Sequence, residues 1–162
     1  MSAQCAIILP LLSALLLASA GCGIVPKIVV MRDPLSAEEH NDLGVAYERK
    51  GTYALAEDEY RAAQRKRTDW HLPAYNLGNL YYRMRRYDDA EERYRAAIAL
   101  DPRCSDCMNN LAWLLRERGR LAEARALAER ALAVRNAPEY ADTLRKIAED
   151  EKRPSGKTPG GR

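Results

Sequence analysis

The stretch that decides the fold runs from Ala74 to Pro102 and reads AYNLGNLYYRMRRYDDAEERYRAAIALDP. Its apolar residues recur at helical spacing in two runs, which a short polar turn separates. The small residues Gly78 and Ala90 stand where two helices would approach closely, and the larger Tyr81 and Tyr94 would fill the space around them. The stretch therefore predicts two antiparallel helices that pack along a tight seam.

The same pattern occurs three times without a gap. Leu43, Leu77 and Leu111 follow one another at intervals of 34 residues. Five further sets keep the same register, namely Gly44, Gly78 and Ala112; Tyr53, Tyr87 and Leu121; Ala56, Ala90 and Ala124; Tyr60, Tyr94 and Ala128; and Ala63, Ala97 and Ala131. The hairpin is therefore an internal repeat, and its copies are expected to stack on one another.

A helical hairpin repeated at this period resembles the tetratricopeptide repeat. The resemblance implies an all-α fold, an α-solenoid of three tetratricopeptide hairpins over residues 36–136, at about 37–70, 71–104 and 105–138. A C-terminal capping helix is expected over residues 137–152, because the last hairpin would otherwise expose an apolar face.

Local signals mark the ends of the expected helices. Ser36 followed by Glu39 forms a capping-box sequence. Gly51 and Gly119 stand at hairpin turns, where a left-handed backbone suits glycine. We expect helices over residues 36–50, 53–67, 71–84, 87–100, 105–118, 121–135 and 138–151. Residues 153–162 are basic and rich in Pro and Gly, so we expect a disordered tail there.

Composition and charge narrow the function classes. The chain has 162 residues, about one domain, and a net charge of +3 with acidic and basic residues interleaved. Nucleic-acid binding favours a clustered basic face instead, so no nucleic-acid partner is expected. His40 and His71 stand at the starts of successive repeats, without a nearby nucleophile or a partner at metal-ligand spacing. We therefore expect no enzyme, no cofactor and no metal.

Residues 1–21 resemble a bacterial secretion signal of the lipoprotein type. They carry no charged side chain and end in small residues directly before Cys22. The resemblance implies that Cys22 is lipidated and becomes the first residue of the mature protein. Acyl chains on Cys22 would hold it at a membrane in the bacterial cell envelope, facing the periplasm, with residues 22–35 as a tether. Gly23 replaces the aspartate of inner-membrane retention, which slightly favours the outer membrane.

Three alternatives stay open for this end of the chain. Residues 18–20 also fit ordinary signal cleavage, which would release a soluble protein. The uncharged stretch of about 20 residues is long enough to stay in a membrane as a helix. Lys27 and Arg32 would then place the repeats on the cytoplasmic side. A start at Met31 would leave a cytosolic adaptor.

Cys104 and Cys107 form the one motif with possible redox or metal chemistry. A helix N-terminus lowers the pKa of a thiol, which would favour reactivity. The usual redox context, a strand-to-helix turn, is not predicted here, and a zinc site would need two further ligands. The two cysteines are therefore interpreted as small packing residues or as a disulfide in an oxidising compartment, with a redox or metal-linked accessory role as the alternative.

The resemblance implies that the first helix of each hairpin lines a concave groove that binds a peptide or protein partner. Asparagine amides can pair with an extended backbone, and aromatic side chains supply contact area. Alternatively, Asn76 and Asn110 satisfy backbone groups between repeats, and Trp113 is buried against the next helix. The candidate groove residues are Tyr75, Asn76, Asn79, Tyr82, Arg83, Asn109, Asn110, Trp113 and Arg116.

The resemblance implies that the protein is a non-enzymatic scaffold or adaptor, which is anchored by lipid and acts in envelope or pilus assembly. Asn41 and Asp106 stand at positions where family members that grip heat-shock C-termini carry lysine, which argues against that ligand. A purely structural array that associates with itself is a further alternative.

Overall fold

The computed structural model of the chain describes residues 33–152. The predicted signal over residues 1–21, Cys22, Met31 and the tail over residues 153–162 lie outside the described residues, as does the tether before residue 33. Residues 34–152 form one compact unit.

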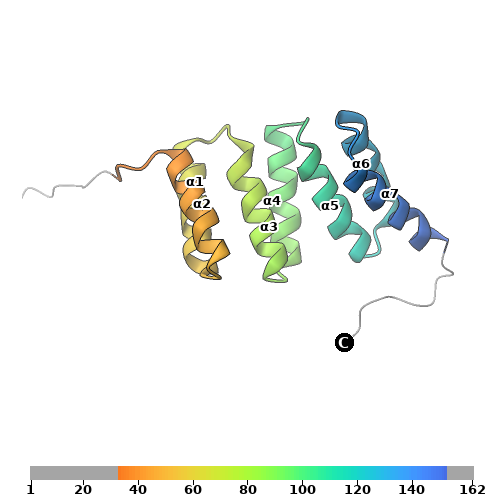
Figure 1. The fold of residues 1–162 in the computed structure, drawn as a ribbon, viewed down its shortest axis with the longest axis horizontal. Coiled ribbons are helices and arrows are strands. Elements are labelled where there is room, and N and C mark those ends of the chain that lie inside the picture. Colours follow the sequence, from red (N-terminus) through yellow and green to blue (C-terminus); the bar gives the residue numbers. More distant parts are fainter. Residues whose placement is uncertain (1–32, 153–162) are drawn as a thin grey trace, which may run out of the picture. The chain divides into compact units, whose positions relative to one another are not determined.

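Seven helices make up this unit, and each contacts the next along the chain (Figure 1). They are α1 (Ala37–Arg49), α2 (Tyr53–Lys66), α3 (His71–Arg83), α4 (Tyr87–Leu100), α5 (Ser105–Glu117), α6 (Leu121–Val134) and α7 (Pro138–Glu151). The first six pair as the hairpins α1–α2, α3–α4 and α5–α6, and α7 contacts both α5 and α6. The prediction of an all-α solenoid of three hairpins with a capping helix is confirmed.

The seam inside each hairpin is a contact between a small residue and the residue opposite it. The rings of Tyr60 and Tyr94 lie so close to Gly44 and Gly78 that an added Cβ atom would be 2.6 Å and 2.5 Å from them. The third hairpin has Ala112 where the first two have glycine, and its opposite residue is an alanine in place of tyrosine. Both alanines are fully buried, so the seam keeps its packing while its residues change.

Helix ends follow the local signals with one exception. Ser36 and Glu39 form the capping box in full, with each side chain bonded to the other's backbone N–H. Gly51 and Gly119 adopt the left-handed conformation at their hairpin turns, with φ of 77° and 75°. The corresponding turn of the second hairpin has Arg85 with φ of 59°. The hairpin turn thus requires a left-handed backbone even where no glycine is present, and Arg85 adopts this conformation at a cost in backbone strain.

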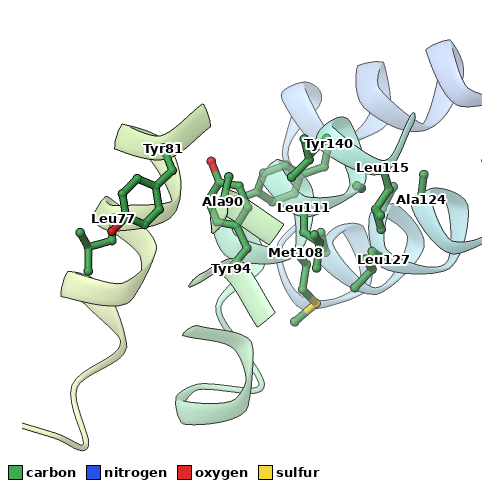
Figure 2. Close-up of a cluster of buried hydrophobic side chains, with 14 of the residues drawn as sticks. Leu77, Tyr81, Ala90, Tyr94, Met108, Leu111, Leu115, Ala124, Leu127 and Tyr140 are labelled. Carbon is green, nitrogen blue, oxygen red and sulfur yellow. The ribbon is translucent and has the colours of Figure 1, made fainter. Parts of the chain in front are cut away.

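The core continues from hairpin to hairpin and into α7. Figure 2 shows Leu77 and Tyr81 of α3 in a cluster that runs through Leu111 and Leu115 of α5, and the cluster also includes Tyr60 of α2. Ile147 of α7 is fully buried in the same cluster, and so is the Tyr140 ring, apart from 1% of its surface. The capping helix therefore covers the apolar face that the third hairpin would expose.

Carboxylates on the second helices tie neighbouring hairpins together. Glu57 of α2 accepts hydrogen bonds from Arg61 at 2.6 Å and from Arg86, which precedes α4, at 3.2 Å. Glu91 of α4 repeats this arrangement with Arg95 at 2.8 Å and Arg120 at 2.7 Å. Burial alone would raise the pKa of Glu91, but the hydrogen bonds from these two arginines outweigh it and lower the pKa.

Candidate peptide-binding site

A pocket of about 380 Å³ opens on the face formed by the first helices of the hairpins. We call it the first-helix pocket. It contains six of the predicted groove residues, whereas Tyr75, Asn76 and Arg116 are not in its lining. The lining consists of Glu48 from α1; Asn79, Tyr82 and Arg83 from α3; Tyr94 from α4; and Asn109, Asn110 and Trp113 from α5.

Hydrogen bonds between side chains hold the amides of the pocket in place. The Oδ1 of Asn79 accepts from the hydroxyl of Tyr94 at 2.8 Å and from the Nδ2 of Asn110 at 2.9 Å. The same Nδ2 donates to the hydroxyl of Tyr75 at 3.2 Å. One hairpin earlier, the Nδ2 of Asn76 donates to the Oδ1 of Asn41 at 2.8 Å. Asn76 and Asn110 thus bond other side chains of the first helices rather than the backbone groups considered from the sequence.

Trp113 and Tyr82 form an aromatic wall of the pocket. The indole N–H of Trp113 donates to the hydroxyl of Tyr82 and to Oε1 of Glu117, both at 3.1 Å. The Tyr82 hydroxyl donates to Oε2 of Glu117 at 2.7 Å. Burial, followed by this bond to the carboxylate, raises the pKa of Tyr82 to about 12. Trp113 is half-buried, and the ammonium of Lys146 on α7 lies 4.8 Å from its ring centroid. The tryptophan therefore contacts α7 and lines the pocket as well.

Arg116 connects α5 to α7. Its Nε lies 2.6 Å from Oδ2 of Asp150, and both side chains are mostly buried. Its guanidinium also stacks over the Trp113 ring, 4.9 Å from the centroid. Arg116, predicted as a groove residue, lies outside the lining of the first-helix pocket and pairs with α7 instead. The carboxylate that holds it lies on α7, and the sequence does not indicate this pairing.

The charges of the pocket neutralise each other. The Nε of Arg83 lies 3.1 Å from Oε1 of Glu48, whose Oε2 accepts from the Tyr60 hydroxyl at 2.8 Å. The buried Oδ1 of Asn109 has no hydrogen-bond partner within the described part of the chain. A buried acceptor of this kind is costly unless a donor reaches it. Amides, aromatic rings and a paired arginine therefore suit an uncharged segment with hydrogen-bond donors.

Tyr94 is the lining residue that the sequence did not indicate. Tyr94 was assigned to the seam, yet its hydroxyl reaches Asn79, the residue that follows the glycine under its ring. Glu48 lies on the first helix of the first hairpin, 35 positions before Arg83, and the sequence does not indicate the ion pair between them. Asp106 lies outside the pocket, and its Oδ1 accepts a hydrogen bond from Arg135 at 2.6 Å. The charge of Asp106 therefore does not indicate which ligand the pocket binds.

Cys104 and Cys107 form a disulfide at the start of α5. Cys107 is fully buried in a small cluster with Ala74 and Ala97. The Sγ of Cys104, the N-cap residue, accepts from the backbone N–H of Cys107 at 3.2 Å. The bond thus closes the first turn of α5, and Cys107 packs this turn against Ala74 and Ala97 of the second hairpin.

Two kinds of feature are absent from residues 33–152. No helix in this part of the chain is long and apolar enough to cross a membrane. In the same residues, no group of three or more His, Cys, Asp or Glu side chains is arranged to hold a metal ion. His40 is buried and lies 2.6 Å from Oε2 of Glu59, a pairing across the first hairpin that the sequence did not reveal.

Solved structures share this arrangement of helices. The first tetratricopeptide domain of Spaghetti (RPAP3), bound to the HSP90 peptide SRMEEVD, is 24% identical with a TM-score of 0.69, covering 72% of this chain and 94% of that one. The second tetratricopeptide domain of human RPAP3, in complex with the HSP70 peptide SGPTIEEVD, is 24% identical with a TM-score of 0.64, covering 69% and 94%. The first domain of human RPAP3 is 24% identical with a TM-score of 0.66, covering 70% and 90%.

A comparison with curated proteins finds no match. The tetratricopeptide repeat family model matches residues 27–69 and 75–141, which is more than half of the chain. The chain belongs to the tetratricopeptide repeat family.

Proposed function

We propose that this protein is a non-enzymatic interaction scaffold that binds an extended, uncharged peptide segment of a partner protein in the first-helix pocket. The observation that carries the proposal is the pocket itself, where an aromatic wall faces amides held by mutual hydrogen bonds. Aromatic anchors in a preorganised site are typical of binding hot spots.

The charge of the pocket argues for a ligand unlike the acidic peptides bound to the RPAP3 domains. Arg83 is the one cation of the lining, and Glu48 neutralises it. A carboxylate-rich terminus would therefore lose its hydration without gaining a free cationic partner. An uncharged segment avoids this cost and can donate to the buried Oδ1 of Asn109.

We further propose that Cys22 is lipidated and holds the repeats at a bacterial envelope membrane, facing the periplasm, where they serve envelope or pilus assembly. The uncharged residues 1–21 and the small residues before Cys22 support this location. The disulfide between Cys104 and Cys107 also supports it, because disulfides persist in oxidising compartments.

Peptide selection tests the binding proposal. A library that contains both uncharged and acidic extended peptides is selected on the full chain, and the Kd of the selected peptide is then measured against variants. Trp113→Ala should weaken binding about thirtyfold, as expected for a hot spot. Trp70→Ala is the matched control, since Trp70 is the chain's other tryptophan, is half-buried and lies outside the pocket. Equal losses in the two variants, or selection of acidic peptides alone, would contradict the proposal.

The mass of the intact protein, purified from its native membrane, tests the anchor. A species that begins at Cys22 and carries added acyl mass is expected, and Cys22→Ala should abolish it. An unmodified chain that begins at Met1 or Met31 would overturn the lipid anchor and move the partner search to the cytoplasm.

A further inference from the structure

A second groove, of about 490 Å³, lies between α2 and α4 with α3 beneath it. We call it the second-helix groove. Leu77 and Tyr81 of α3 form its floor. It shares no lining residue with the first-helix pocket, so a ligand here is independent of the proposed peptide site. The remaining lining residues are polar or charged: Arg61, Gln64, Arg65 and Thr68 on the α2 side, and Arg86, Asp89, Glu92 and Arg93 on the α4 side.

The next hairpin provides an internal reference for what the fold itself requires here. Arg61, Arg86 and Asp89 have the counterparts Arg95, Arg120 and Glu123, each 34 residues later. These residues take part in equivalent ion pairs. Arg86 pairs with Asp89 of α4 at 2.7 Å and with Glu57 of the hairpin before at 3.2 Å. Arg120 pairs in the same way with Glu123 and Glu91, both at 2.7 Å. This part of the groove's charge is therefore structural.

The other polar residues of the lining do not recur in the next hairpin, so the fold itself does not require them. Arg65 and Arg93 correspond to Ala99 and Leu127 in the next hairpin. The counterparts of Gln64, Thr68 and Glu92 are Ile98, Pro102 and Ala126. The same fold thus accommodates small and apolar residues at all five positions, and packing does not demand the polar ones.

The charges of this non-repeating set leave an excess of cations in the groove. The set has two arginines, Arg65 and Arg93, and one carboxylate, Glu92, which pairs with Arg93. The repeating arginines are neutralised, since Arg61 and Arg86 pair with Glu57 and Arg86 also pairs with Asp89. Arg65 is exposed and has no carboxylate partner among residues 33–152.

We propose that the second-helix groove binds an acidic segment of a partner protein. Arginine presents a planar fork that matches a carboxylate, and the side chains of Gln64 and Thr68 can bond the backbone beside it. Asp89 and Glu92 would repel a dense polyanion such as nucleic acid or an anionic lipid surface. Isolated carboxylates on an extended peptide can instead reach the arginines and avoid both acids.

The test exchanges the groove's arginines for the residues of the next hairpin. The full chain in non-ionic detergent is titrated with a fluorescent peptide that has glutamate at every second position, and anisotropy reports binding. Arg65→Ala with Arg93→Leu should weaken binding about tenfold, the sum of two exposed ion pairs. Arg103→Ala with Arg130→Ala is the control of equal charge, since both arginines are exposed and lie outside the groove.

The outcomes separate this inference from the proposed function. Retained binding in the control and loss of binding when glutamine replaces glutamate in the peptide would support the groove. Equal weakening in the two double variants would overturn it, and so would binding to vesicles of phosphatidylglycerol but not to the peptide. Trp113→Ala should leave binding of the acidic peptide unchanged, so a failure of the first-helix pocket leaves this result intact.

Discussion

A Cβ atom on Gly78 would lie 2.5 Å from Cδ1 of Tyr94, closer than carbon atoms pack in proteins. The tyrosine ring therefore occupies the space that any other residue at position 78 would need. In the third hairpin, where Ala112 replaces the glycine, the opposite residue is Ala128 and no ring competes for the space. The two positions of the seam are thus coupled.

This coupling predicts that the effect of Gly78→Ala on the free energy of unfolding changes sign when Tyr94 is replaced. Alanine improves helix propensity over glycine by about 1 kcal/mol, but overpacking against the ring costs about 1–3 kcal/mol. Gly78→Ala should therefore destabilise the chain by about 1 kcal/mol, measured by urea unfolding. In a Tyr94→Leu background the ring is gone, and the same change should stabilise. As a control, Ala112→Gly should destabilise the chain by about 1 kcal/mol. Glycine has the lower helix propensity, and no tyrosine ring faces position 112 to offset that loss. An unchanged effect of Gly78→Ala in both backgrounds would contradict the coupling.

The left-handed Arg85 predicts a stabilising substitution. Its φ of 59° is unfavourable for a residue with a Cβ atom, and glycine stands at the same turn of the other two hairpins. Arg85→Gly should raise the free energy of unfolding by about 1 kcal/mol. Gly119→Ala is the reciprocal control, because an added Cβ would meet nothing within 4 Å and only the backbone conformation would act. A stabilising Gly119→Ala would show that these turns are not strained by a side chain.

The fold could be predicted because its decisive signals are local and repeated. Leucines at intervals of 34 residues and the small residues of the seam indicate the hairpins without any knowledge of partners. Arg85 is the exception at this level, because hairpin geometry, rather than the residue, sets the conformation of that turn.

The site was less accessible to sequence reasoning because its contacts join different hairpins. The resemblance to the tetratricopeptide repeat predicted Asn79 and Trp113 on the inner face, and the structure puts both in the pocket. The pairing of Arg116 with Asp150 depends on how α7 docks, and the ion pair of Arg83 with Glu48 depends on how α1 stacks on α3. Helical period defines a face, but it does not define which polar groups on that face satisfy each other.

The disulfide predicts a stability that depends on redox conditions. A bond between Cys104 and Cys107 closes a short loop, and a loop of this size contributes about 2 kcal/mol in the chain-entropy account. A reductant should therefore lower the melting temperature of the native chain. The double variant Cys104→Ala with Cys107→Ala should melt at the same temperature with and without the reductant. A native chain that is insensitive to reduction would mean that the bond does not constrain unfolding.

The raised pKa of Tyr82 predicts a loss of stability at alkaline pH. Burial and the bond to Glu117 move the pKa from 10.0 to about 12, so the folded chain favours the neutral phenol. The resulting stabilisation is fully present below about pH 10 and is lost as the pH rises to about 12, because the unfolded tyrosine ionises first. Over this range, urea unfolding of Tyr82→Phe should show a shallower decline than the native chain. Glu117→Gln removes the neighbouring carboxylate and should also make the decline shallower, and an identical slope in all three proteins would exclude Tyr82 as its source.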